Sequence, residues 1–101
     1  MIHVIASIHV KPNCLAEFLA IFKENIPAVR QEQGCIDYEP TQDLPTGLAA
    51  QELNGSVVTI IEKWASLEAL QVHLAAPHML AYQKQVKALV EKVVLKVLEK
   101  A

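Results

Sequence analysis

The chain has 101 residues, of which 52% are hydrophobic, and its formal net charge at pH 7 is −2. This length suits one domain over residues 1–101 and is too short for two. The single arginine, Arg30, and the scattered lysines exclude a basic nucleic-acid-binding stripe, and no apolar run approaches the roughly 20 residues of a membrane span. The first residues lack the basic region of a signal peptide, so we expect a cytoplasmic protein that binds neither nucleic acid nor membrane.

The first predicted elements are a strand and a long helix. Over residues 2–10 every second side chain contributes to one apolar face, formed by Ile2, Val4, Ala6, Ile8 and Val10. After the break at residues 11–13, Asn13 is a suitable N-cap for a helix. That helix carries an apolar stripe at a period of 3.6 residues, formed by Leu15, Phe18, Leu19, Phe22, Ile26 and Val29. Pro27 predicts a kink or a restart within it, and Gly34 is the expected C′ terminator.

The rest of the chain predicts four more strands and two helices. A strand opens over residues 35–39, and the prolines, aspartate and glycine of residues 40–47 predict an irregular segment. Asn54-Gly55 predicts a type I′ hairpin turn between strands over 48–53 and 56–63. Ser66 is expected to cap a helix that turns Leu67, Leu70 and Leu74 inward. Pro77 suits the first turn of the next helix, whose apolar face is Met79, Tyr82, Val86, Leu89 and Val90. Alternation over 93–98 predicts a last strand, although propensity also allows a helix over 89–98.

The order β-α-β-β-α-β predicts an α+β fold, the ferredoxin-like split βαβ arrangement. Both helices then cover one face of the sheet and leave the other face bare. The strand over 57–61 is nevertheless apolar on both sides, and a sheet with two apolar faces must cover both. We therefore expect a homodimer in which the face bearing Ile5 and His9 meets a second copy across a two-fold axis.

Two histidines are candidate acid–base groups. His73 lies roughly 80° around its helix from the centre of the leucine stripe, at about 100° per residue, so it can reach the edge of a cavity. His78 occupies a similar flank in the first turn of the following helix. A purely structural role as edge residues stays open for both. His3 and His9 alternate on the strand face opposite the helices and are expected to be interfacial or exposed.

Four further residues could line a binding site. Trp64, the only tryptophan, closes a strand and could be an aromatic wall or a core anchor. Tyr82 and Tyr38 face inward, and a ligand oxygen or a backbone carbonyl could satisfy each hydroxyl. Glu62 shares the strand face of Ile60 and Trp64, where it could orient a histidine or sit at the sheet rim.

Several chemical signatures are absent from the sequence. Cys14 and Cys35 form neither a C-x-x-C motif nor a metal spacing, and both are expected to be packing groups. There is no phosphate-binding glycine loop, no recognised arrangement of metal-binding histidines and no Gly-x-Ser-x-Gly elbow. We therefore expect no metal and no cofactor, so any oxygen chemistry has to use the electrons of the substrate.

Two segments together resemble the antibiotic biosynthesis monooxygenase family, above all its quinol-monooxygenase-like members. They are Gly34-Cys35-Ile36-Asp37-Tyr38-Glu39 and Glu62-Lys63-Trp64-Ala65-Ser66, the latter followed by Leu70, His73 and Pro77-His78. The resemblance implies a dimeric α/β barrel that oxidises naphthalenic or polycyclic phenols with molecular oxygen and without a cofactor. The positions that match the family site are Trp64, His73, His78 and Tyr82.

Three positions differ from the family pattern, and they argue against two of the functions found in the family. Ile60 stands where antibiotic-tailoring members carry an asparagine, which argues against their polyketide substrates. Gln83 stands where haem-degrading relatives carry the iron-ligating histidine, and Ser7 stands near their asparagine, which argues against haem. The alternatives to a monooxygenase are an isomerase of a small metabolite and a non-catalytic quinone-binding or stress-response module.

Overall fold

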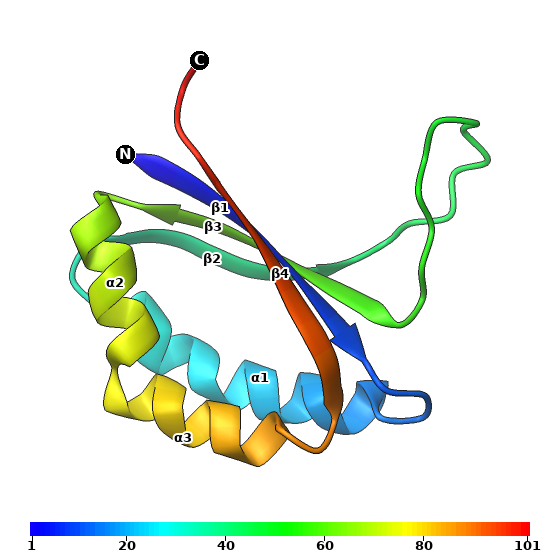
Figure 1. Cartoon of the computed structure of the whole chain (residues 1–101), viewed down its shortest axis with the longest axis horizontal. Coiled ribbons are helices and arrows are strands. Elements are labelled where there is room, and N and C mark those ends of the chain that lie inside the picture. Colours follow the sequence, from blue (N-terminus) through cyan, green and yellow to red (C-terminus); the bar gives the residue numbers. More distant parts are fainter.

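Four strands and three helices follow one another along the chain, and the computed structural model describes all of residues 1–101. Their order is β1 (Ile2–Val10), α1 (Leu15–Arg30), β2 (Cys35–Gln42), β3 (Val57–Trp64), α2 (Leu67–Ala75), α3 (Pro77–Val86) and β4 (Val90–Leu98). The strands form one antiparallel sheet in the order β2-β3-β1-β4, and all three helices lie on one side of it (Figure 1). This arrangement confirms the predicted ferredoxin-like fold.

The core lies between the helices and one face of the sheet. The predicted apolar face of β1 is buried at Val4, Ala6, Ile8 and Val10. All five aromatic residues of the chain are buried in the same layer: Phe18, Phe22, Tyr38, Trp64 and Tyr82. By contrast, β4 has no buried residue, although most of its side chains are apolar. An apolar strand with this exposure is typical of a surface that another subunit covers.

The ends of α1 differ from the predicted ends. The N-cap is Cys14, whereas Asn13 was predicted. Asn13 has a φ of 65° and lies in a turn that is closed by the hydrogen bond from the Cys14 N–H to the Lys11 carbonyl. No restart occurs at Pro27, because its carbonyl accepts the Gln31 N–H and the last turn closes. The C-cap is Gln31, so Gly34 is not the C′ residue and lies in the turn that follows.

The predicted hairpin at Asn54-Gly55 is wrong. Residues 48–53 form no strand, and β3 instead pairs with β2, which continues through Pro40 to Gln42. A proline without an N–H is tolerated there because β2 is an edge strand. Residues 43–56 form a projecting loop (Figure 1), in which Asp43 Oδ2 accepts the Asn54 N–H at 2.8 Å and Asn54 Oδ1 accepts the Ser56 N–H at 2.9 Å. The asparagine therefore closes the base of this loop.

The two helices predicted after β3 are present as α2 and α3. Ser66 caps α2 as expected, since its Oγ accepts the Ala69 N–H at 3.1 Å, and Pro77 occupies the first turn of α3 as expected. Only one leucine of the predicted inward stripe, Leu70, is buried, whereas Leu67 and Leu74 are exposed. No helix is both long enough and apolar enough to cross a membrane.

Candidate functional site

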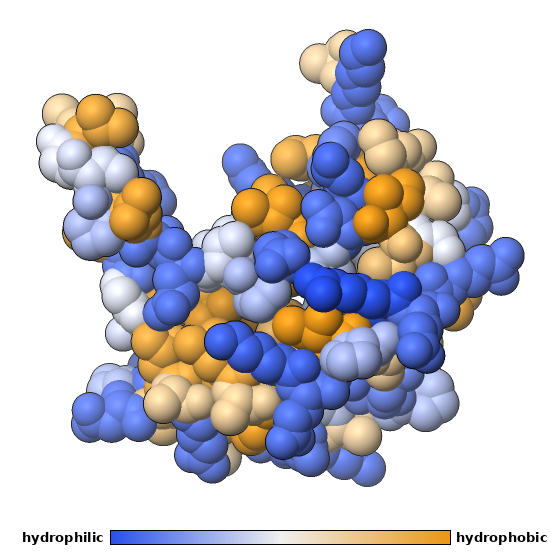
Figure 2. Space-filling model, turned by 180° about the vertical axis from the view of Figure 1, so that it is seen from behind, coloured by the Kyte–Doolittle hydropathy of each residue, from blue (hydrophilic) through white to orange (hydrophobic).

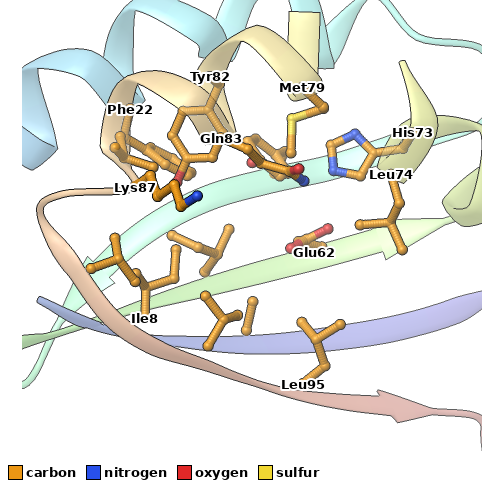
Figure 3. A pocket seen from close by; sticks show the side chains of 16 residues that line it. Ile8, Phe22, Glu62, His73, Leu74, Met79, Tyr82, Gln83, Lys87 and Leu95 are labelled. Atoms are coloured by element: carbon orange, nitrogen blue, oxygen red, sulfur yellow. The ribbon is translucent and has the colours of Figure 1, made fainter. Parts of the chain in front are cut away.

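A cavity of about 500 Å³ lies between the helices and the sheet. This volume is typical of small-molecule sites. Twelve of its sixteen lining residues are hydrophobic. The lining comprises Ala6, Ile8, Phe22, Tyr38, Ile60, Glu62, His73, Leu74, Met79, Tyr82, Gln83, Val86, Lys87, Val90, Val93 and Leu95. Figure 3 shows His73 and Glu62 at one end of the cavity and Tyr82 with Lys87 at the other.

His73 is the buried imidazole of this cavity. It lies on α2, its side chain is 2% exposed, and its ring packs against Trp64 at a centroid distance of 4.5 Å. The edge position predicted from helical spacing therefore underestimates its burial. The reason is that the start of α2 lies close to the turn after α1, so Leu70 and His73 are buried. Leu67 is exposed, and Leu74 is partly exposed where it borders the cavity. His73 is fixed in the wall of the cavity by its neighbours.

The hydrogen bond of His73 determines what its free nitrogen can do. Nδ1 lies 2.8 Å from Glu32 Oε2, and an ionised carboxylate only accepts, so the Nδ1–H donates to it. The lone pair is then on Nε2, which has no hydrogen-bond partner in the protein. Burial lowers the pKa of His73, and the Glu32 carboxylate partly opposes this effect. His73 is consequently a neutral imidazole at neutral pH and can accept a proton from a bound molecule.

The same carboxylate oxygen also accepts from His78. His78 Nε2 lies 2.8 Å from Glu32 Oε2, and the side chains of Glu32 and His78 are 11% and 30% exposed. His78 does not line the cavity, so the two predicted histidines are brought together at Glu32 but not at the cavity. Glu32 is not among the predicted site residues, because it lies in an irregular turn far from either histidine along the chain and belongs to no motif.

Gly34 holds the turn of Glu32 against α2. Its φ is +87°, and a Cβ added there would lie 2.6 Å from the Cβ of Ala69. Its carbonyl accepts the Ala65 N–H at 2.8 Å, which joins this turn to the segment between β3 and α2. Only glycine therefore allows the close approach that places Glu32 beside His73.

Glu62 is a second buried ionisable group in the cavity wall. It is 5% exposed, and its Oε1 accepts the Trp64 Nε1–H at 2.9 Å. Burial raises the pKa of Glu62 to about 7, and the indole hydrogen bond partly opposes this shift. Glu62 therefore carries a proton for much of the time at neutral pH. It does not orient a histidine; Glu32 does.

Trp64 lies behind the cavity and does not line it. Its side chain is fully buried, with the indole bonded to Glu62 and packed against His73. The residue predicted as an aromatic wall for a ligand thus supports the two ionisable groups that face the cavity. This arrangement matches the core-anchor alternative, and the carboxyl group of Glu62 is the partner of the indole N–H.

Two tyrosines contribute neutral hydroxyl groups to the cavity. Tyr38 stacks on Phe22 at a centroid distance of 5.5 Å, and Tyr82 meets Phe22 edge-on at 5.8 Å. Burial raises the pKa of both tyrosines above the ordinary value, and the nearby Glu62 raises it further. Neither hydroxyl has a hydrogen-bond partner in the protein, so each can donate to a ligand oxygen. Ile60 also lines the cavity and adds apolar surface.

The remaining candidate residues lie outside the cavity. Cys14 and Cys35 are free thiols, and His3 and His9 lie on the sheet face opposite the helices, as expected. No three His, Cys, Asp or Glu side chains are arranged to hold a metal ion. Taken together, the cavity can enclose a planar apolar ring, accept one of its protons at His73 and donate hydrogen bonds from the tyrosines and the protonated Glu62.

This chain is similar to known proteins of one family. The family model described as antibiotic biosynthesis monooxygenase matches residues 1–85. The Escherichia coli K12 protein named Probable quinol monooxygenase YgiN is 34% identical over 101 residues, covering 98% of this chain and 97% of that protein. Among solved structures, a conserved protein from Methanosarcina mazei Go1 has a TM-score of 0.85 at 26% identity and covers 99% of this chain and 92% of its own.

A second solved structure, Rv0793 from Mycobacterium tuberculosis, has a TM-score of 0.82 at 27% identity and covers 99% of this chain and 94% of its own. Both structures align along almost the whole length of the fold, including every element that contributes to the cavity. The family match and the E. coli relative support a monooxygenase-type function. The chain belongs to the antibiotic biosynthesis monooxygenase family.

Proposed function

We propose that this protein is a homodimeric, cofactor-independent monooxygenase that oxidises a quinol-like aromatic substrate, a naphthalenic or polycyclic phenol, with molecular oxygen. The observation that carries the proposal is the neutral His73, whose Nε2 is free in the wall of a mostly apolar cavity. The name of the E. coli relative, a probable quinol monooxygenase, supports the same substrate class.

The first step is removal of a phenolic proton. The O–H of the substrate, with a solution pKa of about 10, gives its proton to His73 Nε2 and leaves an electron-rich aryloxide. The Nδ1–H of the resulting imidazolium still donates to Glu32. Tyr38 and Tyr82 remain protonated and can donate hydrogen bonds to the negative oxygen. The apolar lining keeps water away from the ring.

The second step is reaction with oxygen. The aryloxide transfers an electron to dioxygen, and the resulting radical and superoxide combine to form a C–O bond at a ring carbon. Cleavage of the O–O bond leaves one oxygen atom on the ring and releases the other as water. A naphthohydroquinone and dioxygen thus give a hydroxynaphthoquinone and water, and the substrate supplies all four electrons. The proton held by His73 returns to the departing hydroxide, which regenerates the neutral base.

Oxygen uptake with 1,4-naphthohydroquinone tests this function. Spontaneous oxidation of the quinol is measured without protein and subtracted. We expect steady uptake with the wild type and a decrease of about 10²–10⁴-fold for His73→Ala, the usual range for losing a general base. Gln71→Ala, an exposed change on the same helix, is the matched control and should keep the wild-type rate.

Other outcomes identify the alternatives. Equal rates for His73→Ala and the wild type would exclude His73 as the base and leave the structural role. Quinone binding without turnover above the blank would identify the non-catalytic binding module. A product of unchanged mass that forms without oxygen would identify the isomerase.

The proposed dimer is supported by the exposed apolar face of the sheet. Ile61 pairs with Ile5 on the side away from the helices, where Ile61 is 41% exposed, and Val94 and Leu98 are exposed on the same side. Figure 2 shows a hollow on this side, between the projecting loop and the C-terminal end. A second copy packed there would bury on the order of 2,000 Å² or more, as stable homodimers do. Light scattering that shows only monomer at micromolar concentration would contradict the dimer.

A further inference from the structure

We propose that Glu32 is the positioning residue of this site: it holds His73 in the Nδ1–H tautomer, so that Nε2 faces the substrate, and it balances the positive charge when His73 takes a proton. The proposal rests on the proposed function and adds to it the residue that sets the state of the base. His78 takes part as a second donor to the same carboxylate oxygen.

Three separate elements converge on one atom. Glu32 comes from the turn after α1, His73 from α2 and His78 from the first turn of α3, yet both imidazoles donate to Glu32 Oε2 at 2.8 Å. The exposed fraction rises from 2% at His73 through 11% at Glu32 to 30% at His78. The carboxylate thus lies between the base in the cavity and a second imidazole near the surface.

The other oxygen of Glu32 indicates that this arrangement is not selected for stability alone. Glu32 Oε1 is buried and has no hydrogen-bond partner. An unpartnered buried acceptor costs free energy, and such groups in native proteins call for an explanation. A carboxylate kept beside a histidine at this cost is consistent with a role in proton transfer, as in the carboxylate–histidine pairs of hydrolases.

The charges around His73 predict opposite effects for the two partners. Glu32 raises the pKa of His73 through its hydrogen bond and its negative charge, whereas burial and the neighbouring His78 lower it. Tyr38 and Trp64 pack against the ring, and both remain uncharged, while Glu62 faces the same cavity. Removing the Glu32 charge should therefore make His73 a weaker base, and removing His78 should make it a slightly stronger one.

Histidine ¹⁵N NMR of the ligand-free protein tests the tautomer without any need for turnover. In the wild type above pH 7 we expect the proton of His73 on Nδ1 and that of His78 on Nε2. Glu32→Gln should reduce the Nδ1–H fraction of His73 and lower its pKa, whereas the exposed control Glu24→Gln should change neither. A wild-type His73 with its proton on Nε2 would overturn the proposal, whether or not the Glu32 variant folds.

Kinetics test the role of the charge. The pH midpoint of quinol oxidation should move to lower pH in Glu32→Gln, with kcat reduced about 10²-fold or more and KM within about threefold. In His78→Gln the midpoint should move to higher pH, opposite to the shift in Glu32→Gln. A merely structural Glu32 would lower kcat without moving the midpoint, and that result would overturn the proposal. If the wild type shows the predicted tautomers but oxidises no quinol, the proposed function fails and the placement of the His73 proton by Glu32 stands.

Discussion

Replacing Gly34 with alanine should destabilise the protein by about 2–5 kcal/mol. The structure gives two reasons. Gly34 has a φ of +87°, and an L-residue in this region costs about 1–2 kcal/mol. The new Cβ would also lie 2.6 Å from the Cβ of Ala69, and overpacking of this kind costs about 1–3 kcal/mol. Neither contacting atom is the end of a flexible side chain, so the backbone has to move.

Gly47→Ala is the matched control for the backbone contribution. Gly47 has a φ of +75°, and an added Cβ would meet nothing within 4 Å. This change should therefore cost only the conformational part, about 1–2 kcal/mol. Urea unfolding at one fixed protein concentration measures both variants, because the stability of a dimer depends on concentration.

The same substitution connects the fold to the site. Gly34 lies two residues after Glu32, and displacement of its turn should lengthen the hydrogen bond between Glu32 and His73. Gly34→Ala should therefore lower kcat for quinol oxidation in the fraction that stays folded, while Gly47→Ala should not. Equal destabilisation by the two variants would refute the steric part of this reasoning. Full activity in Gly34→Ala would refute its link to the base.

Three further changes test other parts of the structure. The raised pKa of Glu62, about 7 against an ordinary 4.5, means that its contribution to stability is present at low pH and is lost as the pH rises from about 4.5 to 7. Glu62→Gln should thus match the wild type in urea unfolding at pH 4 and exceed it by up to about 3 kcal/mol at pH 8. An equal difference at both pH values would contradict the shift. Trp64→Phe removes the indole donor from Glu62 and should cost about 1–3 kcal/mol more at pH 8 than at pH 5; a penalty independent of pH would mean that only packing was lost. Ile61→Asp places a charge on the exposed sheet face and should give monomers by light scattering, whereas an intact dimer would place the interface elsewhere.

Much of the fold could be predicted because local patterns and tertiary packing agree. Three local signals are kept in the packed structure: the alternation of β1, the Ser66 cap and Pro77 at the start of α3. The hairpin predicted at Asn54-Gly55 was wrong because long-range strand pairing outweighs the local turn signal. β2 pairs with β3 along its length, so residues 48–53 have no strand to pair with.

The site was less predictable, because it depends on contacts between distant segments. His73, Glu62, Tyr38 and Tyr82 were identified from their types and faces, and all four line the cavity. No spacing links His73 to Glu32, since the two meet only where the turn after α1 packs on α2. The pKa values of the ionisable groups in the site depend on their burial. The shifted pKa of Glu62 arises from its surroundings in the fold and has no sequence signal.

Labelling with ¹⁸O₂ shows whether an oxygen atom of dioxygen enters the product. Mass spectrometry follows the quinone product formed from 1,4-naphthohydroquinone, and a parallel reaction in labelled water corrects for carbonyl exchange. We expect one ¹⁸O atom in each product molecule and the other in water, with formation of the labelled product reduced about 10²–10⁴-fold in His73→Ala. An unlabelled quinone accompanied by labelled hydrogen peroxide would show that the protein transfers electrons to oxygen without inserting it, and would contradict the assignment as a monooxygenase.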